Sequence, residues 1–135
     1  MPDAKRLKCL HRVRTLQVGL ARAEEARTQA QLTSETQLAQ RIAQLAGAVA
    51  PSPATFAGAV NLAAAAHFRD RLHRSAEAAQ NRVRMAEAQV ERSAEATRGA
   101  RRDQSAVEKL LERRHAADLR AEMKALEDAP ARPKR

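Results

Sequence analysis

The fold is decided by the stretch from Leu72 to Leu111, which reads LHRSAEAAQNRVRMAEAQVERSAEATRGARRDQSAVEKLL. Taken in steps of four and three residues, this stretch presents a line of positions without a single charge, in a chain that is 30% charged. The line consists of Leu72, Ala76, Ala79, Val83, Ala86, Val90, Ser93, Thr97, Ala100, Gln104, Val107 and Leu111. Such spacing, sustained over about five heptads, predicts one face of a coiled coil. A helix of this length needs a partner helix to bury that face.

The composition favours long helices over a compact core. Aromatic residues make up 1% of the 135 residues, and there are only four glycines and five prolines. Ala, Leu, Glu, Gln and Arg, which dominate, are all good helix formers. A chain of this kind does not readily build the enclosed pocket of an enzyme. We therefore expect a non-enzymatic protein with no cofactor and no small-molecule substrate.

The partner helix is expected in the N-terminal part of the chain, over about residues 3–47. Its apolar residues recur at Leu7, Leu10, Val13, Leu16, Leu20 and Ala23, and the pattern returns at Leu38, Ile42, Leu45 and Val49. The stretch GAVAPSP, from Gly47 to Pro53, then predicts a turn over about residues 48–53, because glycine ends helices and proline cannot continue them. A second helix is expected over about residues 53–127, followed by a disordered basic tail at 129–135.

Folding the chain at Pro51 tests whether the two helices can pair with each other. In an antiparallel pair, the numbers of facing residues add up to a constant. Leu20 with Val83 and Val13 with Val90 give about 103, twice the position of the turn. The prediction is an all-α fold in which residues 1–128 form an antiparallel coiled-coil hairpin with a longer second helix. An intermolecular coiled coil, kinked at Pro51, remains the alternative.

In this register the first helix ends opposite about residue 100. The segment from Arg101 to Glu127 is then expected to extend beyond its partner, with an apolar stripe and many charges. An unpaired amphipathic segment of this kind is suited to docking another protein.

No catalytic or metal-binding pattern is present. His67 and His73 are six residues apart, so they do not share a helix face as a zinc-binding pair would. The single Cys9 excludes an intramolecular disulfide and fits a reducing cytoplasm. No apolar run approaches the roughly 18 residues that a membrane span needs, and the start of the chain lacks the apolar core of a secretory signal.

The charge predicts an acidic partner. The net charge is +9 and the isoelectric point is about 11.1. Basic residues cluster in the first turns (Lys5, Arg6, Lys8, Arg12 and Arg14) and in the expected overhang (Arg101, Arg102, Lys109, Arg113 and Arg114). Nucleic acid is one candidate, since phosphate contacts need only Lys and Arg. Intermixed Glu108 and Glu112, and the absence of aromatic residues near the basic end for base stacking, favour an acidic protein surface instead.

The other end of the hairpin is expected to be apolar. Leu38, Ile42, Leu45, Val49, Phe56, Leu62 and Phe68 all lie near the turn. Two helices cannot cover every face of these residues. They therefore either close the hairpin tip or form an apolar docking site.

The segment AVEKLLERR, from Ala106 to Arg114, resembles the "E-x-L-x-E-R" stretch of the FliJ family of flagellar type III export proteins and their injectisome counterparts. Glu108, Leu110, Glu112 and Arg113 carry the match. Size, basic charge, scarcity of aromatic residues and a two-helix hairpin with a longer second helix agree with that family. The short basic tail departs from it.

The resemblance implies a cytoplasmic stalk that promotes assembly of the export ATPase ring and links it to the export gate and to export chaperones. Membrane association would then occur only through these partners. The ATPase-facing residues would be Arg12, Arg14, Arg101, Arg102, Glu108, Leu111, Arg113 and Arg114. The gate-facing residues would be Leu38, Ile42, Leu45 and Val49 on the first helix, and Phe68, Leu72, Ser75 and Ala79 on the second. A basic nucleic-acid-binding protein and a self-associating structural coiled coil are the alternatives.

Overall fold

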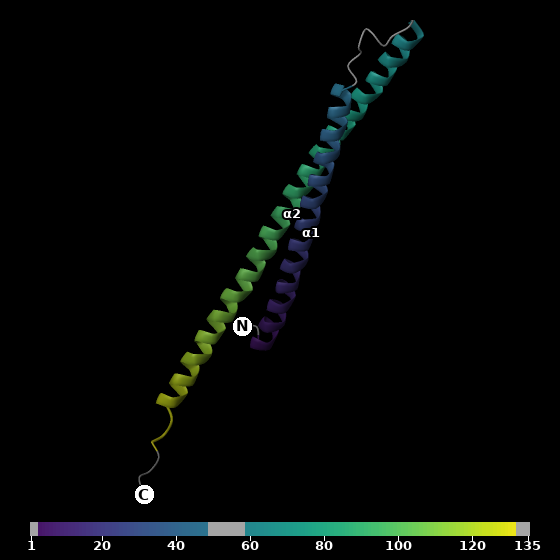
Figure 1. The fold of residues 1–135 in the computed structure, drawn as a ribbon. Helices are drawn as coiled ribbons and strands as arrows, with labels where there is room; N and C mark the ends of the chain where they lie inside the picture. The colour runs from purple at the N-terminus through teal and green to yellow at the C-terminus, as the bar shows by residue number, and fades with distance from the viewer. Residues whose placement is uncertain (1–2, 49–58, 132–135) are drawn as a thin grey trace. The chain divides into compact units, whose positions relative to one another are not determined.

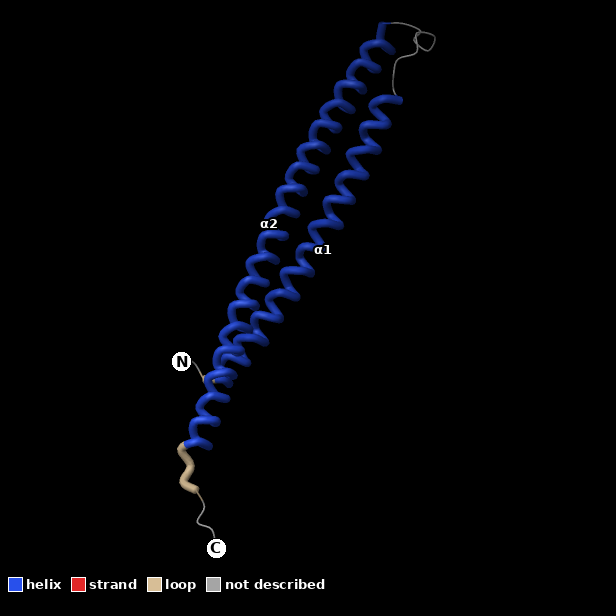
Figure 2. The backbone as a smooth tube through the Cα atoms, turned by 90° about the vertical axis from the view of Figure 1, so that its left-hand side faces the viewer, coloured by secondary structure: helices blue, strands red, loops and turns tan. Residues whose placement is uncertain are grey.

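The computed structural model describes residues 3–48 and 59–131, and it contains two helices in these ranges (Figure 1). Helix α1 spans Ala4–Ala48 and helix α2 spans Ala59–Glu127. No strand is present in the described ranges (Figure 2). The prediction of an all-α hairpin with a longer second helix is confirmed. The expected turn, with Pro51, lies outside the described residues, as do Val49, Phe56 and the expected start of the second helix.

The helix ends follow from local chemistry. The backbone N–H of Leu7 donates to the carbonyl oxygen of Asp3 at 3.1 Å, which closes the first turn of α1. At the other end, the N–H of Asp128 donates to the carbonyl of Lys124 at 2.9 Å. Lys124 in the last turn complements the negative end of the helix dipole. Pro130 follows and cannot extend the helix.

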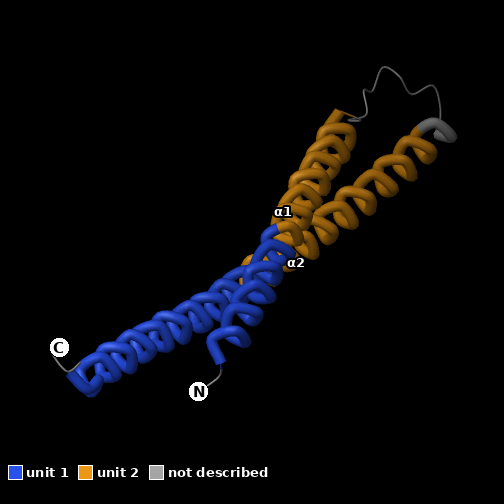
Figure 3. The backbone as a smooth tube through the Cα atoms, turned by 90° about the horizontal axis from the view of Figure 1, so that it is seen from below, with its two compact units in different colours: residues 1–22, 96–135 blue, residues 23–95 orange. Residues whose placement is uncertain are grey.

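Both helices pass through two compact units (Figure 3). Unit 1 comprises Met1–Arg22 with Ala96–Arg135, and unit 2 comprises Ala23–Glu95. Within each unit a segment of α1 lies against an antiparallel segment of α2. In unit 1, Thr15 contacts Gln104; in unit 2, Thr28 contacts Ser93.

The face of α2 that the sequence predicted is confirmed. All twelve positions of the line from Leu72 to Leu111 are buried or half-buried. In unit 2 the best covered is Ala79, and in unit 1 it is Thr97. Most of these residues are small, so the backbone of α1 can approach α2 closely.

The predicted face of α1 is wrong for most of its residues, although Leu7 and Ile42 are covered as predicted. Leu10, Val13, Leu16 and Leu20 are exposed, and among the predicted apolar positions of the first turns only Leu7 is buried. The residues of α1 that are covered instead repeat at steps of four and three. In unit 1 they are Leu7, His11, Arg14, Val18 and Ala21, and in unit 2 they are Glu25, Thr28, Leu32, Glu35, Ala39, Ile42 and Ala46.

The physical reason is that pairs of polar side chains, more than large apolar side chains, decide how the two helices are aligned. The α2 face carries small side chains and hydroxyls, and the covered face of α1 offers groups that bond to them or to charges beside them. Arg82 Nε donates to Glu35 Oε2 at 3.3 Å, and Gln104 Nε2 donates to Thr15 Oγ1 at 3.1 Å.

The register also differs from the prediction. Residue numbers of contacting pairs add up to 117–121 (28 and 93, 35 and 82, 15 and 104, 11 and 108, 14 and 103), rather than about 103. The prediction assumed that the helices are paired tightly up to a turn at Pro51. The observed pairs are instead placed symmetrically about a point in the numbering near residue 59. The expected overhang from Arg101 is therefore wrong, because Asp103, Gln104 and Glu108 all contact α1.

Candidate protein-docking surfaces

Unit 1 holds every residue that the resemblance assigned to the ATPase-facing end. The first turns of α1 supply Arg12 and Arg14, and α2 supplies Arg101, Arg102, Glu108, Leu111, Arg113 and Arg114. Polar contacts across the two helices divide this set into residues that hold the unit together and residues that face solvent.

Two of the set bridge the helices. Arg14 Nη1 donates to Asp103 Oδ2 at 3.3 Å and to Gln17 Oε1 at 3.0 Å. On the neighbouring side of α1, His11 Nε2 lies 3.2 Å from Glu108 Oε1. These side chains are only partly covered, so each pair contributes up to about 1 kcal/mol. Arg14 and Glu108 therefore serve first to hold α1 on α2.

Two more residues of the set make contacts that restrict their side chains. Leu111 is half-buried as part of the covered face. Arg114 Nε lies 3.2 Å from Oδ1 of Asp118, which is one helical turn further along α2. This is an ion-pair distance, but the two groups are not aligned for a hydrogen bond from Nε. The remaining members, Arg12, Arg101, Arg102 and Arg113, have exposed side chains.

The segment that resembles the FliJ family divides in the same way. Glu108 is engaged by His11, whereas Leu110, Glu112 and Arg113 face solvent. Beyond it, Leu119, Met123 and Leu126 are exposed, as is every residue from Asp118 to Ala131. The unpaired end of α2 thus begins near Asp118, about two heptads later than the sequence predicts.

The residues assigned to the gate-facing stripe fall in unit 2. The structure separates them into two groups. Ala79 is buried, and Ile42 and Leu72 are half-buried in the contact between the helices. Leu38, Leu45, Phe68 and Ser75 are exposed. Only this second group offers side chains to a partner. Val49 lies outside the described residues.

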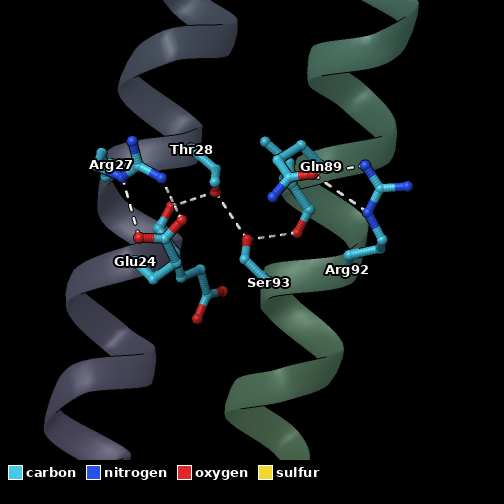
Figure 4. A network of polar contacts seen from close by, with 8 residues as sticks. Glu24, Arg27, Thr28, Gln89, Arg92 and Ser93 are labelled. Atoms are coloured by element: carbon cyan, nitrogen blue, oxygen red, sulfur yellow. Dashed lines mark hydrogen bonds and ion pairs between the residues drawn. The ribbon is translucent and has the colours of Figure 1, made fainter.

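A buried polar contact joins the two helices in unit 2, close to the bounding residues Ala23 and Glu95 (Figure 4). Thr28 is the most deeply covered large side chain, at 1% exposure, and its Oγ1 lies 2.7 Å from Ser93 Oγ. Each hydroxyl also lies 2.9 Å from a carbonyl of its own helix, that of Glu25 or Val90. Three contacts share two hydroxyl protons, so whichever hydroxyl donates across the helices gives up its backbone bond.

An ion pair lies beside this contact (Figure 4). Arg27 Nε donates to Glu24 Oε2 at 2.9 Å, and Nη2 contacts the other carboxylate oxygen. The hydrogen bond and charge of Arg27 lower the pKa of Glu24, and the same contacts raise the pKa of Arg27. On α2, Arg92 Nε donates to Gln89 Oε1 at 3.2 Å. Both pairs keep charged side chains extended along the edge of the contact.

Other chemical groups are dispersed. In the described part of the chain, no three His, Cys, Asp or Glu side chains come together as metal ligands would. His67 and His73 are exposed on α2, and Cys9 is an exposed free thiol. Neither described helix contains a stretch apolar enough to cross a bilayer.

The surface that sequence reasoning missed is the outward face of α1 in unit 1. Leu10, Val13, Leu16 and Leu20 were assigned to the covered face because they are the largest apolar residues there. A second heptad line, beginning at Leu7, runs along the same helix and is the one that is covered. The signal that could have separated them is the match of small and polar residues between that line and α2. Comparisons of the chain with protein-family models, with curated proteins and with solved structures gave no match.

Proposed function

We propose that the chain is a non-enzymatic adaptor of a flagellar or related type III export apparatus, which binds the export ATPase through unit 1. What carries the proposal is that unit 1 brings the two basic segments of the sequence together. Arg12 on α1 and Arg101, Lys109 and Arg113 on α2 are exposed, whereas Arg14 and Glu108 hold the two helices against each other.

The segment that resembles the FliJ family supports the same surface. Its exposed members, Leu110, Glu112 and Arg113, lie within about one turn of each other on α2. A leucine between charges of both signs suits a protein surface better than a uniformly negative one. The exposed apolar residues of unit 2, Leu38, Leu45 and Phe68, offer a separate contact for the export gate or chaperones.

The test is stimulation of the cognate export ATPase by the purified chain. The variant Arg101→Glu/Lys109→Glu/Arg113→Glu reverses three exposed charges of α2 in unit 1. We expect the half-maximal concentration for stimulation to rise at least about fivefold, which corresponds to about 1 kcal/mol of binding. The matched control is Arg41→Glu/Arg71→Glu/Arg84→Glu, which reverses three exposed charges in unit 2 and should leave stimulation unchanged.

Two results would overturn this proposal. If the unaltered chain changes neither assembly nor turnover of the ATPase, the stalk role is wrong. If both triple variants weaken stimulation equally, the effect comes from net charge rather than from the α2 surface.

A nucleic-acid-binding role is the second candidate, and the net charge of +9 is the observation that favours it. Exposed Glu112 and the acidic residues near the end of α2 oppose it, since they repel phosphate. Binding of the unaltered chain to duplex DNA or RNA, with an affinity that falls steeply with salt, would support this role instead.

A further inference from the structure

One face of α1 points away from α2 in unit 1 and carries large apolar residues. Leu10, Val13, Leu16 and Leu20 are 43%, 49%, 69% and 73% exposed. On the covered face of the same helix segment, Leu7 and Val18 are 2% and 5% exposed. The larger apolar residues of this segment are thus mostly in water, and exposed apolar groups of this kind mark interaction sites when they are contiguous.

Three of these residues continue a second coiled-coil seam that begins at Cys9. We call it the outer seam, and it consists of Cys9, Val13, Leu16 and Leu20. Their steps are four, three and four residues, as in a heptad repeat. Each residue stands two positions after one of the covered residues Leu7, His11, Arg14 and Val18. Two positions on an α-helix are about 200°, so the outer seam lies nearly opposite the face that contacts α2.

A helix with heptad seams on two opposite faces is built to lie between two other helices. In α1 the outer seam is also the more apolar of the two, because its counterpart toward α2 contains His11 and Arg14. A shallow hollow at the start of the outer seam is lined by Asp3, Lys5, Arg6, Cys9, Leu10 and Val13. Such a hollow receives the side chain of a packed helix, as knobs-into-holes packing requires.

The flanks of the outer seam are basic. Between Ala4 and Arg22 the helix carries six cations and no carboxylate: Lys5, Arg6, Lys8, Arg12, Arg14 and Arg22. Flanking charges set partner choice in coiled coils, and opposite charges are favoured across the contact. Of the six cations, Arg14 pairs with Asp103 on the side toward α2. A second copy of α1 would still bring the other five cations close to the same contact, so the charge pattern opposes self-association through this seam.

We propose that the outer seam of α1 binds an amphipathic helix of another protein, whose apolar heptad seam is flanked by Glu or Asp. The bound helix packs on the side of α1 opposite α2, so that unit 1 becomes three helices thick. This contact uses α1 alone. It shares only Arg12 with the basic surface of the proposed export function, and it does not depend on that function.

The experiment uses the full chain and three designed peptides. The first peptide has four heptads with Leu and Ile in the seam and Glu at the flanking positions. The second has Lys at those flanking positions, and the third is a scrambled form of the first. Binding is measured by fluorescence anisotropy of labelled peptide. We expect the Glu-flanked peptide to bind at least about tenfold more tightly than the Lys-flanked one, and the scrambled peptide not to bind.

Variants of the chain then locate the contact. Leu16→Gln/Leu20→Gln should weaken binding of the Glu-flanked peptide at least about tenfold without changing the circular dichroism spectrum, since both side chains are already exposed. Leu119→Gln/Met123→Gln is the matched control. It alters two exposed apolar residues of α2 in the same unit and should leave binding unchanged.

Position is checked through Cys9, the only cysteine of the chain. A Glu-flanked peptide with one cysteine in its seam should form a mixed disulfide with Cys9 under a glutathione buffer faster than a peptide with that cysteine on its outer face. Equal rates at the two positions would contradict packing along the outer seam.

Other occupants give results that overturn the proposal. If vesicles of phosphatidylglycerol bind the chain through Leu16 and Leu20 while the Glu-flanked peptide does not, the surface contacts lipid. If the chain sediments as a dimer that Leu16→Gln/Leu20→Gln dissociates, the occupant is a second copy. Equal affinity for the Glu-flanked and Lys-flanked peptides would show that the seam does not select a helix flanked by Glu or Asp, which overturns the proposal.

Discussion

At the scale of residues, the contact between the helices in unit 2 includes two hydroxyl side chains at positions where a typical coiled coil has leucines. Thr28 and Ser93 meet across the helices, and both are buried. Each hydroxyl can also bond a carbonyl of its own helix, so the contact between them adds a bond across the helices, and a typical bond of this kind contributes about 1 kcal/mol. The pair therefore selects one alignment of α1 on α2.

The coupling of this pair can be measured. Thr28→Val and Ser93→Ala each remove one hydroxyl from the contact. We expect each single variant to lower the free energy of unfolding by about 1 kcal/mol and the double variant to lower it by less than the sum of the two. Urea unfolding of all four proteins gives the coupling energy. The exposed residues Thr33 and Ser75, changed to Val and Ala, form a control cycle that should show none.

The ion pair of Glu24 and Arg27 makes a pH-dependent contribution. Because Arg27 lowers the pKa of Glu24 in the folded chain, the pair stabilises the fold above the ordinary pKa of glutamate. That contribution is lost as the pH falls through the lowered pKa. We expect Arg27→Ala to raise the pKa of Glu24 toward its ordinary value, measured by carbon NMR of the carboxyl group. Arg22→Ala, two residues from Glu24, is the control; a Glu24 pKa that is the same in Arg27→Ala and the unaltered chain would contradict the assignment.

At the scale of elements, α1 carries two heptad lines and the structure assigns them to different faces. The line that begins at Leu7 meets α2, and the line that begins at Cys9 faces solvent. Helix α2 has a single covered line from Leu72 to Leu111, after which coverage falls away, and it is fully exposed from Asp118. The shorter helix is thus the one with a second heptad line that faces solvent, which makes it the better candidate for an additional partner.

The register of the two helices is tested by cross-linking in a Cys9→Ser background. We expect Thr28→Cys/Ser93→Cys to form an intramolecular disulfide, because the two hydroxyl oxygens that the thiols replace lie 2.7 Å apart. The pair Leu10→Cys/Ser93→Cys belongs to the alignment expected from the sequence and should remain reduced. Mass spectrometry after oxidation distinguishes the two. Cross-linking of the second pair alone would show that the apolar alignment is the correct one.

At the scale of the whole molecule, the chain leaves much of its surface in water. Its accessible surface is 10881 Å², against about 7000 Å² for an ordinary folded protein of 14.8 kDa. The unfolded chain would expose about 21,500 Å², so folding buries about half of it, compared with about two thirds for a typical domain. We therefore expect a modest free energy of unfolding for the chain by itself.

This surface predicts a shallow response to denaturant. The urea m-value scales with the area exposed on unfolding, so we expect a value about 30% below that of a compact domain of 135 residues. Unfolding followed by circular dichroism at several protein concentrations measures it. An m-value of ordinary size, or a midpoint that rises with protein concentration, would show that copies of the chain cover one another.

Much of the fold could be predicted because it depends on local properties. Helix-forming composition, the scarcity of glycine and proline and the uncharged line of α2 led to two long helices and to the covered face from Leu72 to Leu111. The candidate site was less accessible. Arg14 and Glu108 were assigned to a partner, but they bridge the helices. Leu16 and Leu20 were assigned to the interior, but they face solvent.

What the sequence determined by itself is helix formation, the end of α2 near Glu127 and the charge that any partner must complement, since these follow from each residue and its near neighbours. What only the tertiary structure decided is which line of α1 meets α2 and in which register. Both lines have heptad spacing, so spacing cannot choose between them. The choice is made by pairs distant in sequence, such as Thr28 with Ser93 and Glu35 with Arg82, whose bonds form only when the backbones are close. That choice leaves the outer seam of α1 in solvent.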